Sequence, residues 1–275
     1  AVIGINMGLA AKENRIQILL ESAVEQHQNE ELEAANLIYE EILKSDPNNV
    51  TALQLSGVLA SQVKQYDVSL NLFNKAISIY PSYIDALNNR GLVLKKVGRF
   101  DEALSDFNKV ISFKPDDFES LNNRGIVFNK LQLYEKALLD FNKALSLKPS
   151  NAVVYNNRGN TLKNLQRFDE ALDDYNTALS LDPECTDALN NRGVLFHSFF
   201  RFKDALKDFI QAITLRPNYS EVYNNKGNTL KELYRFDEAL AAYSKAISFK
   251  PKFAIAFNNR GNTYKDLNQV DAALA

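Results

Sequence analysis

The chain has 275 residues and a formal net charge of −2 at pH 7, with 45% hydrophobic and 24% charged residues. This composition is typical of a globular protein, and the charge gives no electrostatic basis for binding nucleic acid or an anionic membrane. The single cysteine excludes an internal disulfide framework, and no apolar run approaches the roughly 18 residues of a membrane span, so we expect a cytoplasmic protein.

One sequence unit recurs at a step of 34 residues. After an N-terminal segment that the pattern leaves poorly defined, 1–15, we expect a repeat array over 16–275. Its units are 16–49, which is divergent, then 50–83, 84–117, 118–151, 152–185, 186–219, 220–253 and a truncated 254–275. All seven prolines keep the step, from Pro47 to Pro251. Such a period indicates stacked helical repeats.

Each unit is predicted to form two helices, as the third unit illustrates. Leu87 and Leu94 are seven residues apart and therefore lie on the same face of a first helix. Gly98 follows and ends that helix. Phe107 belongs to the apolar stripe of a second helix, and Pro115 ends that helix. Two short helices with a tight connection predict an antiparallel hairpin whose outer faces are covered by neighbouring hairpins.

The chain stops at "VDAALA", inside the second helix expected for the last unit. A solenoid needs a covered end. We therefore expect that the sequence is a fragment and that the natural protein continues beyond Ala275.

The glycine, alanine, aromatic and proline at a 34-residue step resemble the tetratricopeptide repeat (TPR) of bacterial type, over about 16–275. The resemblance implies an all-α fold, a right-handed α-solenoid of stacked antiparallel helix hairpins. It also implies a scaffold that binds protein partners. Self-association through exposed terminal repeats is left open.

An arginine follows the paired asparagines in most units, on the packed side of the first helix. A buried cation needs a partner. An aspartate stands 16 residues after four of these arginines, which gives the pairs Arg90 with Asp106, Arg124 with Asp140, Arg158 with Asp174, and Arg192 with Asp208. Where the cation is Lys226, the counterpart is Ala242. This predicts ion pairs within hairpins, and the alternative is an anion-binding ladder of arginines.

The second asparagine of each pair lies about 200° around the helix from the apolar stripe, which predicts that it faces the concave groove. An amide offers a donor and an acceptor, so it can bind a peptide backbone without reading its side chains. The predicted binding residues are Asn89, Asn123, Asn157, Asn191, Asn225 and Asn259. The alternative is that these asparagines cap loops or are only solvated.

No catalytic or metal-binding constellation is recognisable. The two histidines, His27 and His197, are far apart in the array, and Cys185 has no base beside it. A zinc site, a nucleophile elbow and a phosphate-binding loop are missing from the sequence. His197 stands where other units carry lysine, so we expect a surface or groove residue. We therefore predict a protein without enzymatic activity or cofactor in these residues.

Two functions remain open. The first is a scaffold that holds an extended peptide in the concave groove; an asparagine, Asn88, at the position of the clamp lysine argues against a carboxylate clamp of the chaperone-adaptor type. The second is the substrate-recognition arm of a glycosyltransferase, because the row of asparagines resembles the repeat region of O-GlcNAc transferases and SPINDLY-like proteins. In those proteins a catalytic region follows the repeats.

Overall fold

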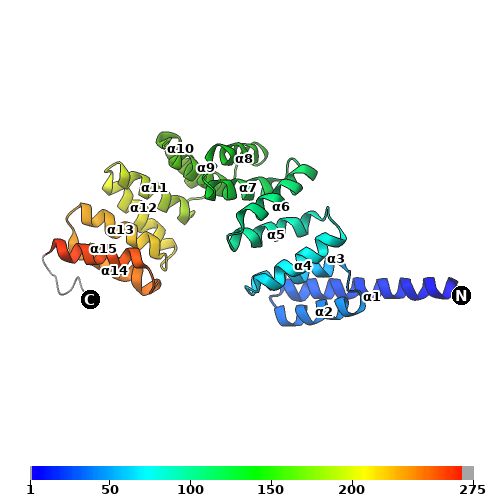
Figure 1. The fold of residues 1–275 in the computed structure, drawn as a ribbon. Helices are drawn as coiled ribbons and strands as arrows, with labels where there is room; N and C mark the ends of the chain where they lie inside the picture. The colour runs from blue at the N-terminus through cyan, green and yellow to red at the C-terminus, as the bar shows by residue number, and fades with distance from the viewer. Residues whose placement is uncertain (1, 268–275) are drawn as a thin grey trace. The chain divides into compact units, whose positions relative to one another are not determined.

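The computed structural model describes the backbone of residues 2–267 and the side chains of residues 12–267. The chain divides into two compact units, Ala1–Gln132 and Leu133–Ala275, and each is described by itself. All secondary structure in the described residues is helical, which confirms the all-α fold class (Figure 1). None of the described helices combines the length and the hydropathy needed to cross a bilayer.

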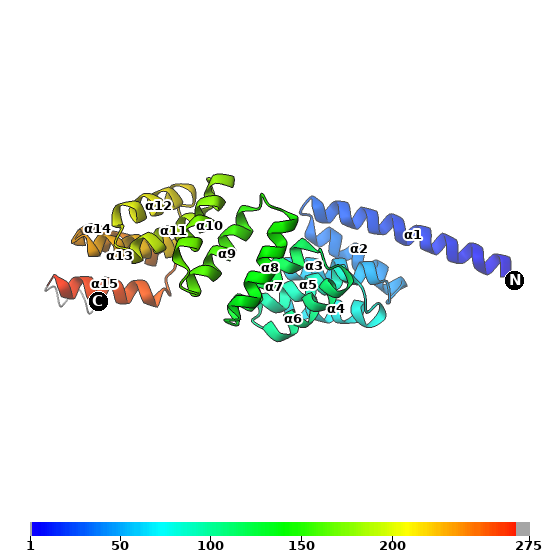
Figure 2. The same cartoon turned by 90° about the horizontal axis from the view of Figure 1, so that it is seen from above.

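The first unit is a row of helix hairpins. Its helices are α1 (Val2–Gln28), α2 (Leu32–Ser45), α3 (Val50–Gln62), α4 (Tyr66–Ile79), α5 (Ile84–Lys96), α6 (Phe100–Phe113) and α7 (Phe118–Lys130). The helices pair as α1 with α2, α3 with α4 and α5 with α6, and α7 packs on α6. Helix α1 begins well before residue 16 and extends past the end of α2 in both views (Figures 1 and 2).

The second unit repeats the same pattern. Its helices are α8 (Tyr134–Leu147), α9 (Ala152–Asn164), α10 (Phe168–Leu181), α11 (Thr186–Ser198), α12 (Phe202–Leu215), α13 (Ser220–Glu232), α14 (Phe236–Phe249) and α15 (Ala254–Asp266). The hairpins are α9 with α10, α11 with α12 and α13 with α14. The expected second helix of the last sequence unit, from 268 onward, lies outside the described residues.

The turn inside each hairpin closes the first helix with a residue in the left-handed region. At Gly98, φ is +81°, its N–H donates to Lys95 O at 3.3 Å, and Arg99 N–H donates to Leu94 O at 2.9 Å. These two bonds form a Schellman motif. The equivalent residues of other hairpins are not glycine and have φ between 58° and 63°: Glu30, Lys64, Gln132, Gln166, Phe200 and Tyr234.

The turn between hairpins begins with the repeated proline and ends, in three cases, at a side-chain cap. Asn49 Oδ1, Asp117 Oδ2 and Asn151 Oδ1 each accept a hydrogen bond at 3.0 Å from the backbone N–H three residues on. Such caps satisfy one of the unpaired N–H groups at a helix start. Proline ends one helix and the cap begins the next, so the turn stays short.

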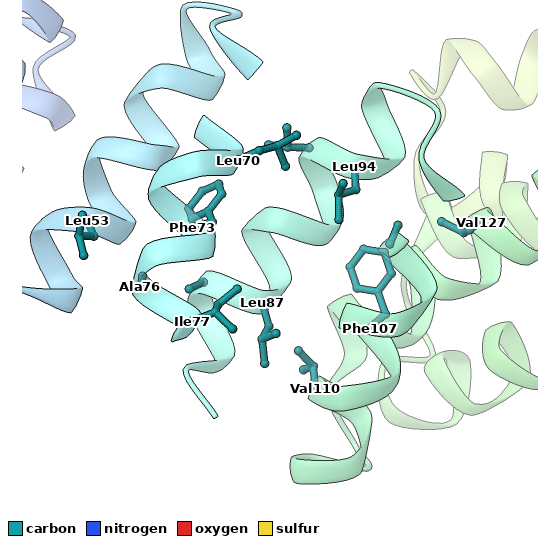
Figure 3. Packing of buried hydrophobic residues seen from close by; sticks show 13 residues of the cluster. Leu53, Leu70, Phe73, Ala76, Ile77, Leu87, Leu94, Phe107, Val110 and Val127 are labelled. Atoms are coloured by element: carbon teal, nitrogen blue, oxygen red, sulfur yellow. The ribbon is translucent and has the colours of Figure 1, made fainter. Parts of the chain in front are cut away.

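In five of the described hairpins the core is an aromatic ring packed on a glycine. A Cβ added at Gly91 would lie 2.8 Å from Phe107 Cε1, and one at Gly57 would lie 2.7 Å from Phe73 Cε1. Figure 3 shows both rings among buried leucine, valine and isoleucine side chains. The glycine therefore lets the two helices of a hairpin approach closely. This geometry fixes which side of the first helix remains available to a partner.

Candidate functional site

The six predicted binding asparagines all lie in first helices of hairpins. They are distributed over α5, α7, α9, α11, α13 and α15, and each is half-buried. In α5, the residues one and two turns from Asn89 on the same side, Asp85, Leu92 and Lys96, are exposed. We call Asn191, Asn225 and Asn259 the amide row, because their contacts are described within one unit.

The amide row is linked to the asparagine pairs of the preceding hairpins. Asn191 Nδ2 donates to Asn156 Oδ1 at 2.9 Å, and Asn225 Nδ2 donates to Asn190 Oδ1 at 2.9 Å. Asn259 Nδ2 donates to Asn224 Oδ1 at 3.0 Å. In these three cases the first asparagine of a pair is the acceptor for the second asparagine one hairpin later, whereas Asn88 Oδ1 accepts from the Ser120 hydroxyl. This gives the doubled asparagine a structural purpose that the sequence did not reveal.

Two further amides are oriented by tyrosine hydroxyl groups from the second helices. Tyr175 Oη donates to Asn160 Oδ1 at 2.8 Å, and Tyr243 Oη donates to Asn228 Oδ1 at 2.9 Å. Both tyrosine rings are fully buried. Burial raises the pKa of both hydroxyls, to about 12 for Tyr243, so they remain donors at neutral pH. Hairpins with phenylalanine in place of the tyrosine carry an apolar residue in place of the asparagine, as Phe209 does with Val194.

A half-buried cationic position joins neighbouring first helices. Lys95 Nζ donates to Asn123 Oδ1 at 2.7 Å, and burial lowers the pKa of this lysine. At the equivalent position His197 Nδ1 contacts Thr229 Oγ1 at 2.9 Å, and burial lowers the pKa of this histidine. His197 therefore bridges two hairpins.

The predicted ion pairs are present where both residues belong to one unit. Arg90 Nε and Nη2 donate to the two oxygens of Asp106 at 2.8 and 2.6 Å, and Nη1 donates to Asn74 Oδ1 at 2.7 Å. The same contacts recur at Arg158 with Asp174 and Asn142, and at Arg192 with Asp208 and Asn176. The pair of Arg124 with Asp140 stays a prediction, because its residues belong to different units.

These arginines hold hairpins together. Asp106 is 1% exposed and its guanidinium partner 19%, so the carboxylate is almost completely withdrawn from water. The asparagines that stand 16 residues before Arg90, Arg158 and Arg192 were not predicted from the sequence. The sequence did contain a signal for them, because the unit in which lysine (Lys226) replaces the arginine has Ile210 in place of the asparagine. Each of these guanidinium groups donates to an aspartate on one side and to an asparagine on the other. This supports a structural role for the arginines over an anion-binding ladder.

Metal binding and nucleophilic chemistry find little support in the described residues. No group of three or more histidine, cysteine, aspartate or glutamate side chains there could hold a metal ion. Burial raises the pKa of the Cys185 thiol, which disfavours the reactive thiolate. The described side chains thus offer hydrogen-bonding amides as the most regular polar feature of the molecule.

Sequence profiles of one family match the chain repeatedly. The tetratricopeptide repeat profile matches residues 84–117, 118–151 and 152–185. A TPR repeat profile matches 227–268, and a third tetratricopeptide repeat profile matches 209–241, so that more than half of the chain is matched. A search of curated protein sequences gave no significant match.

Solved structures share the fold at low sequence identity. A tetratricopeptide repeat protein from Parabacteroides merdae aligns over 94% of this chain and 99% of its own, with 19% identity and a TM-score of 0.76. A chain of the APC/C hetero-tetramer Cut9–Hcn1 aligns over 88% of this chain and 48% of its own, with 14% identity and a TM-score of 0.76, so the chain spans about half its length. Pseudomonas aeruginosa pilF aligns over 70% and 87%, with 22% identity and a TM-score of 0.62.

These comparisons give no support to the resemblance to O-GlcNAc transferases. They agree with the helix hairpins, the glycine–aromatic core and the 34-residue step described above. The chain belongs to the tetratricopeptide repeat family.

Proposed function

We propose that the chain is a protein-interaction scaffold that binds extended peptide along its first helices, on the side that carries Asn89 and Asn123 in the first unit and Asn157, Asn191, Asn225 and Asn259 in the second. The observation that supports it most is the regularity of this face. Six consecutive first helices carry an amide at one position, each half-buried and none replaced. An amide can satisfy a peptide group of any sequence.

The spacing of the asparagines suits an extended guest. Neighbouring helices pack about 8–10 Å apart, and a strand advances roughly 3.3 Å per residue, so one asparagine meets the guest about every three residues. Each hydrogen bond contributes on the order of 0.5–1.5 kcal/mol, so the four asparagines of the second unit contribute roughly 2–6 kcal/mol. Association costs about 4–15 kcal/mol. The amides alone thus give weak binding, and side-chain contacts of the guest set the affinity.

The hydrogen bonds within the protein support this proposal by orienting the amides in advance. A side chain already held by Asn156, Asn190 or Asn224 loses little further freedom when a guest binds. Preorganised groups bind more tightly because less conformational entropy is lost on association.

The experiment is a selection followed by substitution. A random 12-residue peptide display library is selected on the purified chain, and the affinity of the best peptide is measured by fluorescence anisotropy. Asn191→Ala combined with Asn225→Ala should weaken binding about 5- to 150-fold, from two lost bonds. Asn218→Ala, at an exposed loop asparagine, is the matched control and should leave the affinity unchanged. Failure to select any peptide, or equal affinity of the double variant and the control, would contradict the proposal.

A further inference from the structure

The amides of the second unit are divided between two hydrogen-bonding roles. Asn259 Nδ2 donates to both Asn224 Oδ1 and Asn228 Oδ1, each at 3.0 Å. Its two N–H groups are therefore used inside the protein, and its Oδ1 is the remaining polar atom. Asn191 and Asn225 each use one N–H of Nδ2 in a bond to the preceding hairpin at 2.9 Å, and their Oδ1 atoms have no hydrogen-bond partner among the described residues.

In the hairpins that contain Tyr175 and Tyr243, the amides of Asn160 and Asn228 use Oδ1, and not Nδ2, for hydrogen bonds within the described part of the protein. Asn228 Oδ1 accepts from Tyr243 Oη at 2.9 Å and from Asn259 Nδ2 at 3.0 Å, which occupies both lone pairs. Asn160 Oδ1 accepts from Tyr175 Oη at 2.8 Å. The remaining polar atom of each is Nδ2, a donor.

The remaining atoms are accessible to solvent. Among the described residues, Ser56 Oγ is the one buried side-chain nitrogen or oxygen without a hydrogen-bond partner. The unpartnered Oδ1 atoms of the amide row and the unpartnered Nδ2 atoms of Asn160 and Asn228 are therefore not buried. They are free to bond with a guest.

We infer that the amide row (Asn191, Asn225 and Asn259) accepts hydrogen bonds from main-chain N–H groups of the guest, while Asn160 and Asn228 donate to its carbonyl oxygens. The inference rests on the proposed function and adds a direction to each bond. In an extended strand, the N–H and C=O of one residue point to the same side. The adjacent Asn259 Oδ1 and Asn228 Nδ2 therefore match one guest residue.

This polarity defines the class of guest. The positions of Asn228 and Asn259 are occupied by asparagine two hairpins earlier as well, at Asn160 and Asn191, although Asn191 Nδ2 bonds to Asn156 and not to Asn160. A single acceptor, Asn225, lies between the two positions. Two hairpins correspond to about 16–20 Å, or roughly five to six residues of strand. The guest must carry free N–H groups at this spacing. Proline has no N–H, so the inference assigns extended, proline-poor segments as guests and disfavours proline-rich ones.

The test uses two aspartate variants of one helix. Asn225→Asp keeps the acceptor towards the guest and loses the Nδ2 that donates to Asn190 Oδ1 inside the protein, whereas Asn228→Asp loses the donor towards the guest. Both variants add the same charge three residues apart in α13, so non-specific repulsion of the guest is similar. The probe is the fluorescein-labelled 12-residue peptide selected above. Circular dichroism melting of each variant verifies that it is folded.

The inference predicts that Asn228→Asp weakens binding roughly 2- to 10-fold more than Asn225→Asp does. Replacing single guest amides by esters, which removes N–H groups one at a time, should weaken binding to the wild type at about every third position. It should have no further effect at the position facing residue 225 in Asn225→Ala. Equal losses in the two aspartate variants, or a larger loss in Asn225→Asp, would overturn the inference. If neither Asn225→Ala nor Asn228→Ala changes the affinity, the proposed function itself is wrong.

Discussion

Removing one carboxylate from the arginine network should destabilise the protein far more than removing its neighbour. Asp174 is almost completely buried and accepts from Arg158 Nε at 2.8 Å and Nη2 at 2.7 Å. Breaking a buried pair from one side costs about 3–5 kcal/mol. Arg158 retains its bond to Asn142 and is about a quarter exposed, so water compensates it in part. We expect Asp174→Ala to lower the free energy of unfolding by about 2–3 kcal/mol.

The assay is urea unfolding followed by circular dichroism, with the slope of the transition checked for constancy. Asp173→Ala is the matched control, because Asp173 is exposed in the same helix and carries the same charge. It should change stability by less than about 0.5 kcal/mol. Combining Asp174→Ala with Arg158→Met should recover part of the loss, because the uncompensated cation is then gone. Equal midpoints for Asp174→Ala and Asp173→Ala would refute the ion-pair reasoning.

Three further predictions concern the core, the turns and pH. Gly159→Ala places a Cβ 2.7 Å from Tyr175 Cε1 and should cost about 1–3 kcal/mol in urea unfolding; an unchanged midpoint would be incompatible with the packing described. Gln166→Gly should raise the free energy of unfolding by up to about 1 kcal/mol in the same assay. The left-handed φ of 60° costs a non-glycine residue more than glycine loses in entropy, and a lower stability of the variant would contradict this. Burial raises the pKa of Tyr243 to about 12, against about 10 in the unfolded chain. The stability that this hydroxyl contributes is complete below pH 10 and is lost between pH 10 and 12, at up to about 1.4 kcal/mol per pH unit. Urea unfolding at stepped pH should therefore show a shallower decline of stability for Tyr243→Phe than for the wild type.

The fold was predictable because its signal is repeated. Gly91 and Phe107 recur at a fixed offset in unit after unit, and the sequence therefore reveals the hairpin and its core. The ion pair of Arg90 with Asp106 was predictable for the same reason, since a buried cation has few suitable partners. The contact with Asn74 was missed because an asparagine carries no charge that demands a partner.

The directions of the amide bonds could not be predicted. An asparagine such as Asn225 can donate or accept, and only the position of Asn190 Oδ1 determines which atom remains free. The left-handed turn residues are similarly hidden, because Phe200 and Tyr234 have none of the usual character of such positions. Their conformation follows from the Schellman bonds of the whole turn.

A crystal structure of the chain with the selected peptide tests the central claim most directly. The account predicts the guest extended along the first helices, with its main-chain nitrogens about 3 Å from Oδ1 of Asn191, Asn225 and Asn259. A peptide bound to the second helices or to the hairpin turns, with these amides contacting only each other and water, would contradict it.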